Sequence, residues 1–69
     1  RQAVAQALSK LDERSQSVIV MRYLEGLTPD EAARVLGIAS GNVRVIQSRA
    51  LDKMAKTLED FDFSREDVY

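Results

Sequence analysis

The 69-residue chain contains no cysteine and no histidine. Without cysteine it has neither a disulfide framework nor a thiolate metal site. Without histidine it lacks the usual general base of enzymes and the commonest metal ligand of proteins. No other constellation of catalytic residues stands in their place. We therefore expect a protein that is not an enzyme and that uses no cofactor.

Long hydrophobic runs are absent as well. No apolar stretch approaches the roughly 20 residues that a membrane-spanning helix needs, and no secretory signal pattern opens the chain. We therefore expect no membrane partner. The chain begins with Arg1 rather than methionine, which suggests a segment cut from a longer protein.

The remaining composition fits one small folded domain. Hydrophobic residues make up 45% of the chain and charged residues 30%, shares that are typical of a globular domain and not of a disordered tail. A chain of this size buries only about 60% of its unfolded surface. Apolar residues in periodic stretches should therefore belong to the core.

The formal net charge of −1 conceals an uneven distribution. Residues 1–57 carry a net charge of +3, whereas residues 58–69 carry a net charge of −4. We therefore divide the chain into a mildly basic domain, residues 1–58, and an acidic C-terminal tail, residues 59–69. The tail has three alternative roles: an autoinhibitor on a basic face, a dock for a regulatory partner, or a solvated terminus.

Apolar periodicity predicts an all-α fold, a small four-helix domain with a C-terminal helix-turn-helix. Val4, Leu8 and Leu11 follow helical spacing and predict a first helix over about residues 2–10. Asp12 is a plausible N-cap for a second helix that runs to about residue 25. Gly26 should end that helix.

The strongest helix-start signal in the chain is Thr28-Pro29-Asp30-Glu31, which has the composition of a complete capping box. The third helix that it opens should end at Gly37, a suitable left-handed C-cap. Ser40 can cap a fourth helix that runs to about residue 60. We predict a tail or a loosely held final turn for residues 61–69.

The third and fourth helices have the features of a helix-turn-helix. Ala33 is small where the two helices must cross closely, and Gly37 supplies a turn conformation that other residues resist. Val43 and Ile46 should face back toward Ala32 and Leu36. The alternative is an ordinary helical hairpin that binds nothing.

The fourth helix has two faces when its residues are placed at 100° intervals. The predicted core side holds Val43, Ile46, Ala50, Met54 and Thr57. The opposite side, which in a DNA-binding helix-turn-helix enters the major groove, holds Gly41, Arg44, Val45, Ser48, Arg49 and Asp52.

The outward residues have side chains that suit DNA. Arg49 can bind the O6 and N7 atoms of guanine, a contact worth about 1–3 kcal/mol of discrimination. Arg44 suits a phosphate, Ser48 suits a base or the backbone, and Val45 can pack on a thymine methyl group. The alternative is that both arginines are solvated helix charges and that Val45 is an isolated surface residue.

The positive charge of this helix is modest. Arg44, Arg49, Lys53 and Lys56 are opposed by Asp52. Because few phosphates can be neutralised, isolated DNA binding should be weak and steeply dependent on salt. We expect such a module to act while tethered to something else that holds it on DNA.

Four stretches carry a specific series of residue types, namely Leu11–Arg14, Val18–Thr28, Glu31–Ala33 and Val35–Ile38. Together they resemble region four of bacterial RNA polymerase sigma factors, over about residues 4–58. The run from Arg22 directly into the helix-turn-helix is most similar to the extracytoplasmic-function group. The segment from Val43 to Met54 looks closer to the recognition helix of primary sigma factors.

This resemblance implies that the fourth helix binds the promoter −35 element and that the earlier helices bind the flap of the polymerase β subunit. It also implies a cytoplasmic location and, as a further partner, an anti-sigma factor. Arg22 and Thr28 match family positions that contact the DNA backbone. The full set of matched DNA-binding positions is Arg22, Thr28, Ser40, Gly41, Asn42, Arg44, Val45, Ser48 and Arg49.

The sequence departs from the family pattern in three places. Asp12 stands where the family often has proline, and it can cap a helix instead. Ala39 stands where the family has the serine that caps the recognition helix, so the cap either moves to Ser40 or is lost. Ser40, Gly41 and Val45 replace bulky or charged reading residues, so the resemblance does not define the −35 sequence.

Two other functions are compatible with a small helical domain. One is the C-terminal domain of a LuxR-type response regulator, which binds DNA as a dimer through its last helix. The other is a pure protein-interaction module held by an anti-sigma protein. The Arg22–Gly26 motif and the Arg49–Leu51 run favour the sigma factor.

Overall fold

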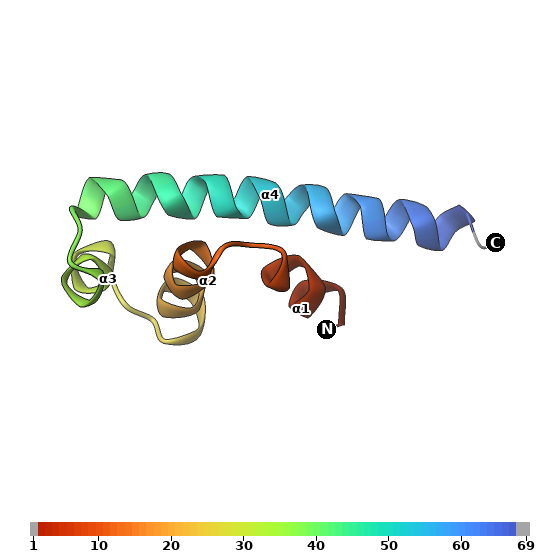
Figure 1. The fold of residues 1–69 in the computed structure, drawn as a ribbon. Coiled ribbons are helices and arrows are strands. Elements are labelled where there is room, and N and C mark those ends of the chain that lie inside the picture. The colour runs from red at the N-terminus through yellow and green to blue at the C-terminus, as the bar shows by residue number, and fades with distance from the viewer. Residues whose placement is uncertain (1, 68–69) are drawn as a thin grey trace.

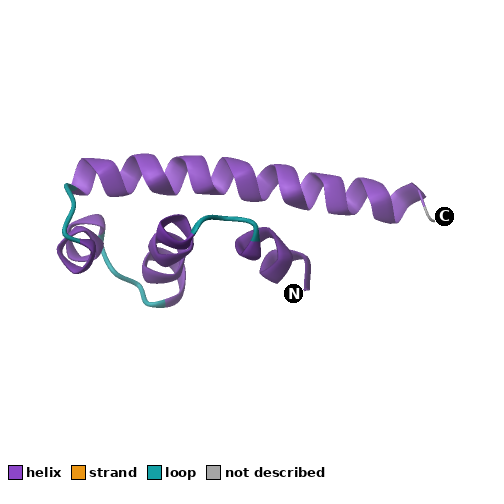
Figure 2. Ribbon diagram, in the orientation of Figure 1, coloured by secondary structure: helices purple, strands orange, loops and turns teal. Residues whose placement is uncertain are grey.

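The computed structural model describes the backbone of residues 2–67 and the side chains of residues 2–60. Within this part of the chain all regular structure is helical (Figure 2). The elements in chain order are α1 (Gln2–Ser9), α2 (Glu13–Ile19), the π-helix η1 (Val20–Leu24), α3 (Pro29–Leu36) and α4 (Ser40–Asp67). The predicted all-α fold with four α-helices is confirmed.

One long helix organises the domain. The α4 helix runs along one side, and α3, α2 and α1 line up beneath it (Figure 1). The described chain is elongated, with extents of 47 × 18 × 16 Å, because α4 projects beyond α1 (Figure 1). Within residues 2–67 no helix is long and apolar enough to cross a membrane.

The core consists of two clusters of buried apolar side chains. The first cluster joins α1, α2 and α4 and contains Ala7, Leu11, Ile19, Ala50 and Met54. The second, which we call the helix-turn-helix cluster, contains Val18, Ala32, Ala33 and Val43, with Leu36 and Ile46 packed against it. Val18 and Ile19, which are neighbours in α2, thus belong to different clusters, and α4 contributes residues to both. The predicted contact between the third and fourth helices is confirmed.

The second predicted helix ends in a wider turn than the sequence indicates. The α2 helix begins at its Asp12 cap, where the Ser15 backbone N–H donates to Asp12 Oδ1 at 2.8 Å. It continues into the π-helix η1, in which the Glu25 N–H donates to the Val20 carbonyl at 3.0 Å. Gly26 follows with a left-handed φ of 70°, as expected for a glycine that closes a helix.

The predicted capping box of α3 is confirmed. The Thr28 hydroxyl accepts from the Glu31 N–H at 3.1 Å, and the Thr28 N–H donates to Glu31 Oε1 at 2.8 Å. At the other end Gly37 has a left-handed φ of 69°, and the Ile38 N–H donates to the Ala33 carbonyl at 3.1 Å. These contacts satisfy backbone groups that a short helix leaves free at its ends.

Of the two alternatives for the start of α4, the cap at Ser40 is wrong and the loss of a side-chain cap agrees with the structure. The helix starts at Ser40, and the Ala39 carbonyl accepts from the Asn42 and Val43 N–H groups at 3.0 and 3.2 Å. Ala39 therefore occupies the N-cap position, and Ser40 is the first helical residue. Because an alanine side chain cannot accept a hydrogen bond, α4 lacks the side-chain cap that α2 and α3 have.

The predicted end of α4 near residue 60 is also wrong, since the helix continues through Asp67. Residues 59–67 contain neither glycine nor proline that would stop it. This segment continues along the axis of α4 instead of folding back on the basic face (Figure 1), so the autoinhibitor alternative is not supported. Residues 68 and 69 lie outside the described residues, and the division of domain and tail at residue 58 stays a prediction.

We predict that Val43→Ala lowers the free energy of unfolding by about 2 kcal/mol, because two buried methyl groups are lost and a cavity remains. Val43 is fully buried, whereas Val45 on the same helix is 45% exposed. Val45→Ala is therefore the matched control, with an expected loss of about 0.5 kcal/mol or less. Urea unfolding followed by circular dichroism measures both. Equal losses would contradict this assignment of the two faces.

We predict that acid removes the stabilisation that the Glu31 carboxylate gives to α3. Hydrogen bonds from the Thr28 backbone and then its side chain hold the pKa of Glu31 below its ordinary value of 4.5. The folded pKa is the lower one, so this stabilisation is fully present above about pH 4.5 and is lost as the pH falls through the folded pKa.

The measurement is the unfolding free energy against pH from neutral to strongly acidic solution. Glu31→Gln should reduce the loss of stability below about pH 4.5, since the titrating group is gone. Glu59→Gln, which removes an exposed carboxylate of α4, is the charge-matched control. Identical pH profiles for the two variants would contradict the role of the capping box.

Candidate nucleic-acid interface

The outward face of α4 lies where the sequence predicts it. Its residues point away from both core clusters, and each of them is exposed: Gly41, Arg44, Val45, Ser48, Arg49 and Asp52. The opposite side contributes the buried residues Val43, Ala50 and Met54. The arrangement therefore leaves one face of the helix after the glycine turn exposed.

The two arginines lie on opposite flanks of this outward face. Arg44 and Arg49 are separated by five residues, which corresponds to about 140° around the helix. Arg49 borders a shallow hollow of about 200 Å³ between α4 and the start of α2, together with Lys53, Asp12 and Ser15. The hydrogen bonds from Ser15 and, to a lesser extent, the charge of Lys53 hold the pKa of Asp12 below 3.8. The Arg49 flank therefore carries both signs of charge.

The first three residues of α4 lie at the end nearest to α3. Gly41 and Asn42 are exposed, and Ser40 is half-buried. A Cβ atom added at Gly41 would meet nothing within 4 Å, so the domain itself leaves open space at this position. Gly41 stands on the outward face, as the helix wheel predicts, with Ser40 and Asn42 on either side of it.

The other two predicted residues, Arg22 and Thr28, make hydrogen bonds within the domain, and their contacts with the DNA backbone stay predictions. The half-buried Arg22 donates from Nε to Gln47 Oε1 at 2.7 Å and from Nη1 to the Leu27 carbonyl at 2.6 Å. The Thr28 hydroxyl is the cap of α3. The structure therefore separates Arg22 and Thr28, which hold elements of the fold, from the residues of α4 that face outward.

Gln47 is not among the residues that the sequence predicts for the site. Its Oε1 accepts from Arg22, and its Nε2 donates to the Tyr23 hydroxyl at 3.0 Å. The available signal was its place on the helix wheel, where a polar residue stands about 40° from the core residue Val43. Its partners lie 24 and 25 residues away in the sequence, and no local pattern indicates them.

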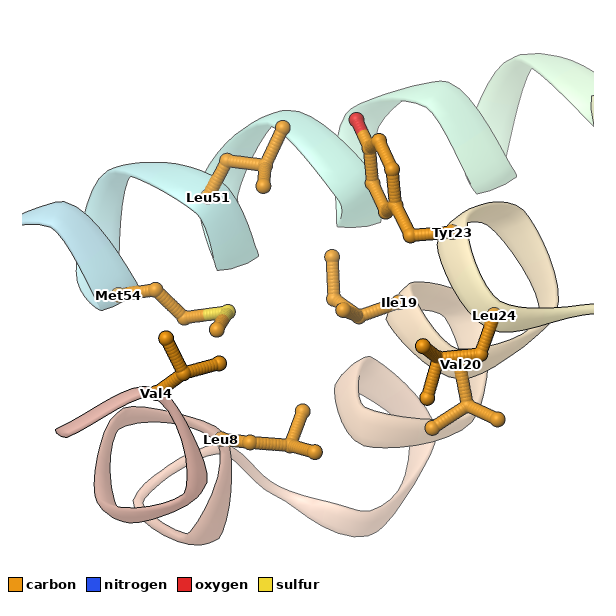
Figure 3. A pocket seen from close by; sticks show the side chains of 8 residues that line it. All are labelled: Val4, Leu8, Ile19, Val20, Tyr23, Leu24, Leu51 and Met54. Carbon is orange, nitrogen blue, oxygen red and sulfur yellow. The ribbon is translucent and has the colours of Figure 1, made fainter. Parts of the chain in front are cut away.

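An apolar groove of about 290 Å³ lies between α1, η1 and the middle of α4. Figure 3 shows its side chains around a common space: Val4, Leu8, Ile19, Val20, Tyr23, Leu24, Leu51 and Met54. Leu24 is 77% exposed and Tyr23 is 55% exposed. Contiguous exposed apolar side chains of this kind mark sites of protein interaction. The family resemblance predicts an interaction surface on the first two helices, but no sequence pattern indicates this groove.

A short capped helix, a left-handed glycine turn and a longer helix with a free outward face define a helix-turn-helix domain. Comparison with known proteins identifies its family. The family model described as sigma-70, region 4 matches residues 7–56. The chain therefore belongs to the sigma-70 region 4 family.

Curated relatives agree with the family and with the extracytoplasmic-function (ECF) type. The ECF RNA polymerase sigma factor BldN of Streptomyces coelicolor is 34% identical over 84% of this chain and 22% of its own length. The ECF RNA polymerase sigma factor ShbA of Streptomyces griseus is 38% identical over 75% of this chain and 27% of its own length. The RNA polymerase sigma-E factor of Streptomyces antibioticus is 32% identical over 90% of this chain and 34% of its own length.

The chain thus spans about a fifth to a third of the length of these relatives. No solved structure shows a significant match to it. The family and the names of the relatives support region four of an ECF-type sigma factor and do not favour the response-regulator alternative.

Proposed function

We propose that this domain recognises the promoter −35 element through the outward face of α4, as part of a sigma factor that directs RNA polymerase to initiate transcription. The observation that carries the proposal is the exposed face of Arg44, Val45, Ser48 and Arg49 on the second helix of a helix-turn-helix. In this motif the second helix lies in the major groove, with its N-terminal residues at the base edges.

The side chains of this face suit two kinds of DNA contact: contacts that read base edges and contacts that position the domain on the phosphate backbone. Arg49 has the planar fork for the O6 and N7 atoms of guanine or for a phosphate, and Arg44 on the other flank suits a phosphate. Ser48 suits a base or the backbone, and the Val45 methyl groups suit a thymine methyl. Ser40, Gly41 and Asn42 lie at the end of α4 that enters the groove first.

RNA polymerase supplies the second attachment in this proposal. The apolar groove has the dimensions and lining for a few apolar side chains of a partner helix, which is one of the common modes of peptide recognition. By family resemblance we assign this partner to the flap of the β subunit. An anti-sigma factor stays a prediction, as a competitor for the same domain.

The two surfaces can be occupied together. The residues of α4 that line the groove, Leu51 and Met54, stand on or near its core side, whereas Val45 and Asp52 stand opposite. A domain with few cations gains effective DNA affinity when a second contact holds it close to the duplex. Docking on polymerase therefore compensates for the modest charge of α4.

We expect Arg49→Ala to weaken binding to a selected duplex by about tenfold and to reduce the salt slope by about 0.9 if the lost contact is a phosphate. Because the −35 sequence is unknown, the duplex is first selected from a pool with a randomised central window. Fluorescence anisotropy at several salt concentrations then gives affinity and slope.

Lys56→Ala is the matched control, since Lys56 is an exposed cation two turns further along α4. This variant should bind the selected duplex within about twofold of the wild-type chain, because the C-terminal half of the helix has left the groove. If Arg49→Ala and Lys56→Ala bind equally well, the proposed recognition face is wrong.

We expect Leu24→Ser to weaken binding of a synthetic β-flap-tip helix by about tenfold or more, because an exposed apolar contact of the groove is lost. Isothermal titration calorimetry measures this affinity. Val35→Ser changes an apolar residue of α3 that is 64% exposed and lies outside the groove, so it should bind like the wild-type chain. Equal weakening in both variants, or no binding of the flap helix to the wild-type chain, would contradict the flap assignment.

A further inference from the structure

We propose that Gln16 is a positioning residue of the apolar groove, whose side chain ties the end of α1 to α2 and so holds the two walls of the groove at a fixed separation. The inference rests on the proposed function, in which this groove receives a helix of RNA polymerase. Gln16 itself does not line the groove, and it lies on α2 rather than on the outward face of α4.

The two walls of the groove come from elements that meet mainly through α4. The α1 helix packs chiefly against α4, and its residues Val4 and Leu8 form one wall. The opposite wall belongs to η1, the continuation of α2, and contains Val20, Tyr23 and Leu24. Figure 3 shows the side chains of the two walls across a common space. The width of the groove is therefore set by the separation of α1 from η1.

The side-chain amide of Gln16 makes two hydrogen bonds across the junction of α1 and α2. Its Nε2 donates to the Leu8 carbonyl at 3.0 Å and to the Leu11 carbonyl at 3.1 Å, in part-buried surroundings. A primary amide has two N–H donors, so both donors of Gln16 have partners. Leu8 is also a wall residue of the groove. Gln16 therefore holds the backbone of a residue whose side chain lines the site.

The C-terminal end of α1 depends on donors from outside the helix. Its last turn contains no basic residue, and no glycine stands between α1 and α2, although the last carbonyls of a helix need partners. The Ser9 hydroxyl donates to the Gln6 carbonyl at 2.7 Å, and the Leu11 N–H donates to the Leu8 carbonyl at 3.1 Å. Gln16 adds the donor that comes from α2. Without it, part-buried carbonyls lose a partner and the end of α1 is released.

The place of Gln16 on α2 connects it with the opposite wall as well. Val20 follows Gln16 by four residues, and the Val20 N–H donates to the Gln16 carbonyl. Residues four positions apart lie on the same face of a helix, so Gln16 and Val20 face the same side. The side chain of Gln16 therefore holds α1, while its backbone carries the first residue of η1.

The test compares how the 69-residue chain binds two ligands, the synthetic β-flap-tip helix by calorimetry and the selected duplex by fluorescence anisotropy. Gln16→Met has nearly the volume of glutamine but cannot donate a hydrogen bond. We expect it to bind the flap helix about tenfold more weakly than the wild-type chain. It should bind the duplex within about twofold of wild type, because the helix-turn-helix cluster keeps its contacts. A residue that merely supported the fold would weaken both interactions.

Gln16→Lys is the rescue variant, because its ammonium group supplies hydrogen-bond donors and suits the carbonyls at the end of a helix. It should bind the flap helix more tightly than Gln16→Met does. The matched control is Gln6→Met, the same substitution at an exposed position of α1 that does not line the groove. This control should bind both ligands within about twofold of wild type. Circular dichroism verifies the helical fold of each variant.

Amide hydrogen exchange gives a readout that needs neither ligand. In Gln16→Met the backbone amides of α1 should exchange about tenfold faster than in the wild-type chain, because the end of this helix is released. The amides of α3 should keep their wild-type rates, since Gln16 makes no contact that holds α3 in place.

The proposal is overturned if Gln16→Met binds the flap helix like the wild-type chain, or if it weakens flap and duplex binding by the same factor. Equal weakening of flap binding in Gln16→Met and Gln16→Lys also contradicts the role of the hydrogen-bond donor, as do unchanged exchange rates in α1. Failure of the wild-type chain to bind the flap helix refutes the proposed polymerase contact instead. In that case the exchange rates still decide whether Gln16 positions α1.

Discussion

Burial against α4 is the interaction on which the rest of the domain depends. The helices α1, α2 and α3 are seven or eight residues long, well short of the roughly 12–15 residues at which an isolated helix becomes marginally stable in water. Each of them gains stability by placing apolar side chains on the long helix. Ala50 and Met54 complete the first cluster, and Val43 completes the helix-turn-helix cluster. Because one helix serves both clusters, its position also decides the position of the outward face.

This dependence explains how so small a domain can present two surfaces. About one side of α4 is needed for the core, and the remaining circumference is divided between the outward face and the edge of the apolar groove. Gln47 lies at the boundary, since its Oε1 accepts from Arg22 and its Nε2 donates to the hydroxyl of Tyr23, a lining residue of the groove. The π-helix η1 helps to separate the two surfaces because it brings Tyr23 and Leu24 to the groove. In our proposal DNA and polymerase therefore meet the same helix from different directions.

The comparison of expectation and structure is most informative at the two ends of α4 and at Arg22. Ser40 has the chemistry of an N-cap, but the helix begins one position earlier than that role requires, because Ala39 already supplies the first accepting carbonyl. The acidic composition of residues 59–69 indicated a tail, yet the backbone stays helical through Asp67. Arg22 matches a DNA-contact position by resemblance, and two of its five N–H donors have partners inside the domain, so its contact with DNA stays a prediction. At both ends of α4 the residue types were identified correctly and the course of the backbone was not.

The features that the sequence determined by itself are those set by neighbouring residues. The capping box at Thr28 and Glu31, the left-handed glycines and the two faces of α4 depend on hydrogen bonds and helical periodicity within a few positions, so a linear pattern contains them. Only the tertiary structure decided the π-turn, the apolar groove and the pairing of Arg22 with Gln47. Arg22 and Gln47 lie 25 residues apart, and the groove joins side chains from Val4 to Met54, so no local pattern contains these contacts. A π-helix is rarely favoured by local sequence, and its neighbours in the tertiary structure stabilise it here.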